Sequence, residues 1–197
     1  MTFVLGLTGS IGMGKSTTAK MFAQEGIPVW DADATVRKLY EKGGSAAELI
    51  AGQYPAVMED GHVSRARLRD LIAQDPAVLD RIQTLVHPLV AQDRAAFLDN
   101  ATAGLVLLDI PLLFETGTDK DCDGIVVVTA PAAVQRQRVL DRGEMSEADF
   151  EMILSRQMPD AEKRARARWV IETLTLDGAR QSVKDIIAEI EGDLADA

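Results

Sequence analysis

Residues 9–16, with the sequence GSIGMGKS, match the pattern G-x-x-x-x-G-K-[ST] at every required position. They lie between an apolar run, residues 3–8, and a stretch with helical spacing, residues 17–25. Glycines allow the main chain to close around phosphate oxygens, and the first turn of the next helix adds partial positive charge. This arrangement predicts a phosphate-binding loop. The alternative, a glycine-rich turn with an incidental lysine, requires both the spacing and the placement to coincide by chance.

The residues of this loop have distinct predicted roles in binding ATP with Mg²⁺. The backbone amides of residues 12–16 should point at the phosphates. The Lys15 ammonium should reach the β- and γ-phosphates, which makes Lys15 a predicted catalytic residue as well. The Ser16 hydroxyl is a predicted Mg²⁺ ligand. The predicted nucleotide-binding residues of the loop are Gly9, Gly12, Met13, Gly14, Lys15, Ser16 and Thr17.

Two carboxylates, Asp31 and Asp33, follow a second short apolar run, residues 27–30. In an open parallel sheet the ligand binds beyond the carboxyl ends of the strands, so both acids are expected to face the phosphate-binding loop. An acceptor hydroxyl needs a carboxylate to orient it and to take its proton, and Asp33 is the predicted base. Asp31 is predicted to support the turn or to hold a magnesium-bound water. For either acid, capping of the following helix is the alternative.

Asp109 follows four apolar residues, 105–108, which read as a buried strand. A carboxylate in this position predicts a Walker-B-like acid beside the water molecules around Mg²⁺. A turn acid at the end of a strand, just before Pro111, is the equally weighted alternative.

Arginines are frequent in the last third of this otherwise acidic chain. Arg138 and Arg142 lie four residues apart on one face of a predicted helix, and Gly143 follows as a candidate hinge. Guanidinium groups brought over the triphosphate would neutralise charge in the transition state, so both arginines are predicted catalytic residues, and Arg142 is also predicted to stack on adenine. Exposed helices with ion pairs to neighbouring acids are the alternative. The cations that follow are Arg156, Lys163, Arg164, Arg166 and Arg168.

The elements that must position these residues alternate along the chain. Apolar runs predict strands at residues 3–8, 27–30, 105–109, 124–128 and 169–172. Helical spacing predicts helices at residues 17–25, 34–42, 131–140, 147–158 and 179–191. Residues 33–100 are predicted to be mostly helical, with a helix start at Asp75-Pro76 and interruptions near Gly61 and Pro88. Alternating strands and helices predict an α/β fold with a parallel sheet between two helical layers.

Several of these segments together resemble the dephospho-CoA kinase family. The resemblance rests on residues 8–17 (TGSIGMGKST), 31–33 (DAD) with Arg37, His87-Pro88, 111–115 (PLLFE) and Gln157, in this order over nearly the whole chain. It implies a kinase of the P-loop type that phosphorylates the ribose 3′-hydroxyl of dephospho-CoA, the last step of coenzyme A synthesis. It also implies an acceptor cleft that contains Asp33, Arg37, His87, Leu112, Phe114 and Glu115.

The resemblance further implies one kinase domain, residues 1–197, in three parts. The nucleotide core would comprise residues 1–31, 104–140 and 168–197, the helical acceptor lobe residues 32–103, and the helical lid residues 141–167. Without the resemblance, His87 reads equally well as a buried histidine beside a helix break, Leu112 and Phe114 as core, and Glu115 as solvated. The chain departs from the family at Arg168 and Thr173, where the family usually has an acid and an asparagine, and this bears on how the adenine is held.

Composition limits the remaining possibilities. The 197 residues are 47% hydrophobic and 26% charged, with a formal net charge of −10, which argues against general nucleic-acid binding. The apolar runs fall short of the ~20 residues that span a bilayer, and Cys122 is the only cysteine, so an intrachain disulfide is excluded. A cytoplasmic monomer or small homo-oligomer is expected.

Three other functions are alternatives to phosphorylation of dephospho-CoA. A P-loop kinase for another small hydroxylated or nucleotide acceptor would use the same base and arginines. A GTP-dependent switch protein would need an Asn-Lys-x-Asp segment, which the sequence lacks. An ATP-binding subunit without turnover is disfavoured because Lys15, Ser16 and Asp33 are all present.

Overall fold

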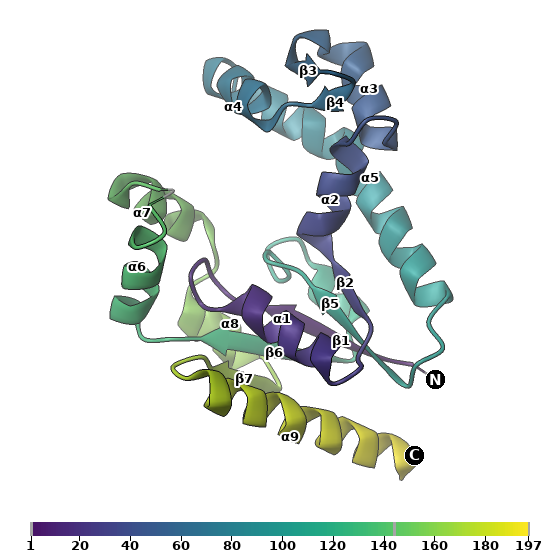
Figure 1. Ribbon diagram of the computed structural model, residues 1–197, viewed down its shortest axis with the longest axis vertical. Helices are drawn as coiled ribbons and strands as arrows, with labels where there is room; N and C mark the ends of the chain where they lie inside the picture. The colour runs from purple at the N-terminus through teal and green to yellow at the C-terminus, as the bar shows by residue number, and fades with distance from the viewer. Residues whose placement is uncertain (1, 144, 197) are drawn as a thin grey trace. The chain divides into compact units, whose positions relative to one another are not determined.

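The chain folds into two compact units in a computed structural model that describes residues 2–143 and 145–196 (Figure 1). The larger unit comprises Met1–Trp30 and Ala101–Ala197, and the smaller unit comprises Asp31–Asn100. The predicted helical stretch, residues 33–100, lies within the smaller unit.

A parallel five-stranded sheet forms the centre of the larger unit. Its strand order is β2-β5-β1-β6-β7, so the first strand of the chain is the middle one. The strands are β1 (Phe3–Thr8), β2 (Val29–Asp31), β5 (Leu105–Asp109), β6 (Gly124–Thr129) and β7 (Trp169–Glu172). The middle strands are buried on both faces, which explains their near-continuous apolar sequences. Because the strands are parallel, their carboxyl ends lie along one edge of the sheet.

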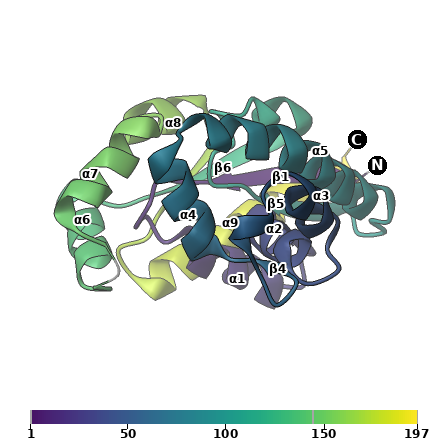
Figure 2. The ribbon, with the colours of Figure 1, turned by 90° about the horizontal axis from the view of Figure 1, so that it is seen from above.

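Helices cover both faces of this sheet, so the predicted three-layer α/β/α fold is confirmed. On one face, α1 (Lys15–Gln24) and α9 (Leu176–Ala195) pack together on alternate strand residues, and Phe22, Leu107 and Ile190 are representative members of that core. α8 (Asp160–Arg166) packs against β6 on the opposite face, as Figure 2 shows. Two further helices of this unit, α6 (Ala132–Leu140) and α7 (Glu147–Arg156), precede α8 in the chain.

The smaller unit has its own hydrophobic core, which includes Ile50, Val57 and Val78. Its helices are α2 (Ala32–Tyr40), α3 (Ser45–Gln53), α4 (Arg65–Gln74) and α5 (Ala77–Asp99). Between α3 and α4 a short hairpin pairs β3 (Met58–Glu59) with β4 (His62–Val63).

The predicted interruption near Gly61 is confirmed: the chain there forms the two-residue turn of the β3–β4 hairpin, in which Asp60 (φ 48°) and Gly61 (φ 89°) both adopt left-handed angles. The predicted interruption near Pro88 is wrong, because α5 continues through Pro88 to Asp99. The predicted helix start is correct to within one residue: Asp75 Oδ1 accepts from the Ala77 amide (3.1 Å). Among the described residues, the helices are too short or too polar for any of them to span a membrane.

Candidate active site

The phosphate-binding loop connects β1 to α1, where the sequence places it. Gly12 (φ 78°) and Gly14 (φ 89°) adopt angles that other residues rarely accept. Gly9 is required by close packing instead, since a Cβ there would lie 2.4 Å from Val128 Cγ2. α1 begins without a side-chain cap, so the amides of its first turn remain available to an anion. The Met13 amide is an exception to the prediction for residues 12–16, because it donates to the Ser10 carbonyl (3.1 Å).

Lys15 forms an ion pair with Asp109 at the sheet edge. The Lys15 Nζ to Asp109 Oδ1 distance is 2.5 Å, and the two side chains are only 13% and 4% exposed. Leu7 pairs with Asp109 in the parallel register, which brings the end of β5 beside the loop that follows β1. Asp109 therefore lies next to the loop lysine, where a Walker-B-like acid is expected. Ser16 and Thr17, the next residues of α1, are exposed.

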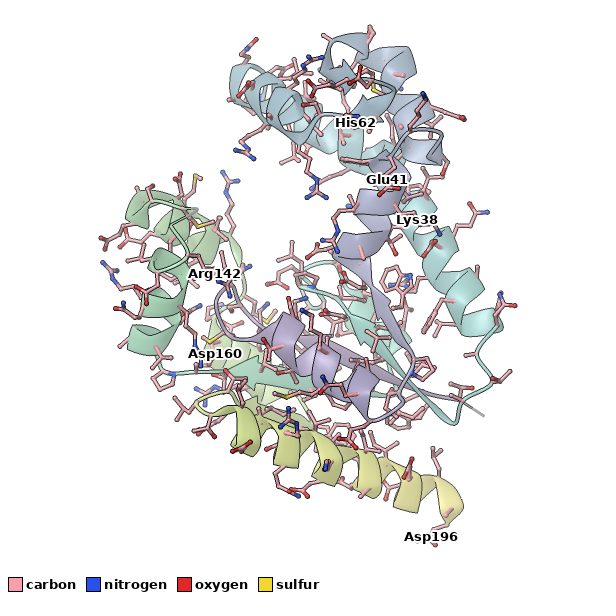
Figure 3. All side chains as sticks on the ribbon, in the orientation of Figure 1. Lys38, Glu41, His62, Arg142, Asp160 and Asp196 are labelled. Atoms are coloured by element: carbon pink, nitrogen blue, oxygen red, sulfur yellow. The ribbon has the colours of Figure 1, made fainter. Side chains whose placement is uncertain are left out.

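A cavity of about 210 Å³ opens beside the phosphate-binding loop, within the larger unit. It is smaller than the ~300–1,000 Å³ typical of small-molecule sites, so it can hold one part of a nucleotide rather than the whole. Figure 3 shows Arg142 just beyond α6, near this loop. The lining comes from the loop, α1, the end of α6 and the segment from β7 into α9, and includes Gly12, Thr17, Arg138, Arg142, Thr173 and Leu176.

Thr173 connects the loop to Arg138. Its hydroxyl donates to the Met13 carbonyl (2.8 Å) and accepts from Arg138 Nη1 (2.9 Å), while Arg138 Nη2 donates to the Thr173 carbonyl. A Cβ on Gly14 would lie only 3.1 Å from the Thr173 hydroxyl oxygen, so this side chain packs directly on the loop. The guanidinium of Arg138 is thus held at the edge of the cavity in this structure.

Arg168 takes no part in this arrangement. It precedes β7, whereas Thr173 follows it, and five steps of extended chain separate the two by roughly 17 Å. Arg168 Nη2 contacts Glu189 (2.8 Å) and Asp193 (2.7 Å) of α9, and its guanidinium stacks over the Trp169 ring. Of the two departures from the family, only Thr173 lines the cavity.

Comparisons with known proteins agree with this geometry. The family model described as dephospho-CoA kinase matches residues 3–176. The chain belongs to the dephospho-CoA kinase family. A dephospho-CoA kinase from Cereibacter sphaeroides is 58% identical over 195 residues, covering 99% of this chain and 98% of that protein, and one from Jannaschia sp. is 59% identical over 191 residues, covering 96% and 98%. A solved structure, TT1252 from Thermus thermophilus, is 35% identical and superposes with a TM-score of 0.83 over 95% of this chain and 97% of that chain.

The PLLFE segment of this dephospho-CoA kinase family member is anchored to α8. Lys163, which is fully buried, contacts Glu115 Oε1 (2.9 Å), and the same oxygen accepts from the Met158 amide (2.8 Å). Desolvation by partial burial acts to raise the pKa of the Glu115 carboxyl, but the hydrogen bonds from Lys163 and Met158 outweigh it, and the pKa lies below its usual value. Lys163 is therefore not an exposed cation of an arm. Glu115 is exposed, but its carboxylate is bonded to Lys163 and to the Met158 amide. Leu112 is 40% exposed, whereas Phe114 is buried.

The remaining predicted acceptor residues, Asp33, Arg37 and His87, belong to the smaller unit, as does Asp31, the candidate for a magnesium-bound water. Asp31 is the N-cap of α2: its Oδ1 accepts from the Ala34 amide (2.9 Å), and its Oδ2 lies 3.8 Å from Arg37 Nη2. Capping, the alternative given for this acid, is thus its observed contact. Asp33 lies in the first turn of α2 and is exposed, as is Arg37. His87 is exposed within the unbroken α5, so the reading as a buried histidine at a helix break is wrong.

Three residues that contact the loop or its supports were not among the predicted site residues. Gln135 and Gln157 both bond to the backbone of Ile11, and Lys163 holds Glu115. Gln157 carried a signal, because it is part of the family resemblance. Gln135 carried only a weak one, its place four residues before Val139 on the buried face of α6. Lys163 carried no such signal, since its burial depends on the packing of α8, which no local sequence pattern predicts.

Proposed function

We propose that the chain transfers the γ-phosphoryl group of ATP, bound as its Mg²⁺ complex, to the ribose 3′-hydroxyl of dephospho-CoA, giving coenzyme A and ADP. The observation that carries this proposal is the loop lysine, Lys15, held beside Asp109 at the sheet edge of a member of the dephospho-CoA kinase family. Membership of the family indicates the acceptor, dephospho-CoA, and the phosphate-binding loop accounts for binding of the donor, ATP.

The larger unit binds ATP on this proposal. The first-turn amides of α1 and the Lys15 ammonium hold the β- and γ-phosphates, and Lys15 exchanges its ion pair with Asp109 for the more highly charged triphosphate. The cavity beside the loop receives the adenosine end, where the planar guanidinium of Arg142 stacks on the base. Arg138 and Arg142 add positive charge that compensates the transition state.

The residues beside the loop also fit a Mg²⁺ ion. Mg²⁺ prefers oxygen ligands and is commonly bound through one or two protein groups together with substrate phosphates. The exposed Ser16 hydroxyl and the Asp109 carboxylate, which a water can link to the metal, supply such oxygens. Asp31, which belongs to the smaller unit, is a further candidate through water. When bound, Mg²⁺ neutralises charge on the phosphate oxygens.

The smaller unit provides the base and part of the acceptor-binding residues. Asp33 orients the 3′-hydroxyl and takes its proton as the hydroxyl oxygen bonds to the γ-phosphorus and the bond to the bridging oxygen of ADP breaks. Arg37 and His87 of the smaller unit contact the acceptor, and so do Leu112, Phe114 and Glu115, which belong to the larger unit. We further infer that residues 32–103 act as the acceptor lobe and residues 141–167 as a lid, in a cytoplasmic enzyme that does not bind nucleic acid.

A coupled assay of ADP release tests the acceptor. The protein is incubated with Mg·ATP and, separately, with dephospho-CoA, adenosine, AMP, pantetheine or shikimate. Turnover with dephospho-CoA alone is expected. Equal or faster turnover with another acceptor would replace the proposed substrate while leaving the kinase assignment intact. ATP binding without turnover of any acceptor would contradict both.

A further inference from the structure

The peptide groups on either side of Ile11, in the outer part of the phosphate-binding loop, are held by two glutamines. Gln157 Oε1 accepts from the Ile11 amide (3.1 Å), and Gln135 Nε2 donates to the Ile11 carbonyl (2.7 Å). The two glutamines come from different places: Gln135 lies in α6, and Gln157 directly follows α7. Both backbone polar groups of this loop residue are therefore satisfied by side chains from outside the loop.

Each glutamine is itself fixed. Gln135 is 4% exposed, and its helix backbone packs on the loop so closely that a Cβ on Gly12 would lie 3.0 Å from the Gln135 carbonyl oxygen. Gln157 is followed by Met158, whose amide donates to Glu115, and Glu115 is paired with the buried Lys163. A side chain whose position is set by buried neighbours can impose geometry on the group that it contacts.

The position of Ile11 gives these contacts a consequence for the ligand. The next residue, Gly12, begins the part of the loop whose amides are expected to reach the phosphates, and it packs so closely on α6 that a Cβ there would lie 2.6 Å from Val139 Cγ2, which leaves the loop little room for adjustment. A rotation of the Ile11 peptides would turn these amides away from the triphosphate. Preorganised donors lower the cost of binding an anion, because no rearrangement is needed when the ligand arrives.

We propose that Gln135 and Gln157 are positioning residues for ATP: they hold the Ile11 backbone so that the phosphate-binding loop is preformed. This inference rests on the proposed function, since it concerns the nucleotide side of the same site. The two glutamines act with opposite polarity. Position 135 must donate a hydrogen bond, and position 157 must accept one.

This opposite polarity allows a sharp test with matched substitutions. Gln135→Met and Gln157→Met remove one hydrogen bond each with little change in size. Gln157→Glu keeps an acceptor for the Ile11 amide, whereas Gln135→Glu places a carboxylate against the Ile11 carbonyl. Dissociation constants for ATP are measured by calorimetry, and KM values for ATP and dephospho-CoA in the ADP-release assay. Melting temperatures are recorded so that each variant is compared well below its own midpoint.

Both Met variants and Gln135→Glu are expected to raise the ATP dissociation constant and the KM for ATP by about five- to tenfold, the loss of roughly one hydrogen bond. The KM for dephospho-CoA should change by less than about twofold, and Gln157→Glu should stay close to wild type. The double Met variant should be impaired by less than the product of the two single effects, because both contacts serve the backbone of one residue.

Three results would overturn the inference. Equal impairment by the two Glu variants would indicate that added charge, not hydrogen-bond polarity, matters at these positions. Wild-type ATP binding in both Met variants would show that the loop forms without them. Parallel increases in both KM values would indicate a general structural effect. Failure of the wild-type protein to bind ATP or to phosphorylate dephospho-CoA would instead contradict the proposed function.

Discussion

The phosphate-binding loop and the first turn of α2 differ in how they present their functional groups. The loop is built mainly from backbone, and buried or half-buried side chains such as Thr173 and Gln135 hold that backbone in place. The start of α2 instead presents the exposed carboxylate of Asp33 on a helix whose cap, Asp31, is local. We infer that the donor side depends on rigid positioning over a long sequence separation, whereas the acceptor side depends on the chemistry of individual side chains.

Replacing the loop lysine tests the first half of this comparison, and it has the largest expected effect. Lys15→Ala removes the only side-chain cation of residues 9–16, so turnover should fall by at least about 10³. Initial rates of ADP release measure the loss. Lys20→Ala is the matched control, because Lys20 is an exposed lysine of the same helix and should leave the rate unchanged. Wild-type-like turnover by the Lys15 variant would refute the proposed role.

Replacing the proposed base tests the second half. Asp33→Asn keeps the shape of the side chain but cannot take a proton, so kcat should fall by roughly 10²–10⁴. The ATP dissociation constant should remain within about twofold of wild type, since Asp33 lies outside the loop. Asp70→Asn, an exposed acid in α4 of the same unit, is the control. A near-normal kcat in the Asp33 variant would mean that the hydroxyl needs orientation by another group.

The difference between the two regions also explains what the sequence can predict. The loop pattern, the strands and the order of elements are local signals, so residues 3–8 and 169–172 match their strands at both ends. The Lys15 contact with Asp109 and the Thr173 contact with Met13 join residues that are 94 and 160 positions apart. No local pattern encodes such contacts, because they arise only when the sheet brings strand ends together.

The predictions that proved wrong also concern contacts between residues far apart in the sequence. Pro88 reads as a helix breaker because it removes a hydrogen bond, yet packing of Val86 and Ile82 into the core of the smaller unit keeps α5 continuous. Lys163 reads as a solvated cation, yet packing of α8 buries it against Glu115. Tertiary contacts overrode local preference in both cases.

The Glu115–Lys163 pair supports the loop indirectly, and its loss should reduce stability more than catalysis. Lys163→Met leaves Glu115 without its cation, and the free energy of unfolding should fall by roughly 1–3 kcal/mol, as measured by urea denaturation at neutral pH. Because the folded-state pKa of Glu115 lies below its ordinary value of 4.5, the stability that it contributes is present above that pH and is lost as the pH falls through the folded pKa.

The wild-type protein should therefore lose its advantage over the Lys163 variant in acid. Glu115→Gln provides the control, since it removes the charge that Lys163 compensates. The double variant, which carries Lys163→Met and Glu115→Gln, should be destabilised by less than the sum of the two single effects. Equal stability differences at neutral and acidic pH would contradict this electrostatic account.

The smallest expected effect separates the two ends of β7. Thr173→Val removes a hydroxyl that bonds to both Met13 and Arg138, at a cost of about 1 kcal/mol in ATP binding, or a rise of roughly fivefold in the KM for ATP. Thr173→Ser retains the hydroxyl and should restore most of the affinity. Arg168→Gln is the matched control, because its ion pairs lie on α9 away from the cavity and surface pairs contribute little. A larger rise in the KM for ATP at Arg168 than at Thr173 would mean that the nucleotide contacts lie at the other end of β7. It would also contradict the contrast between a rigidly positioned donor side and an acceptor side that depends on individual side chains.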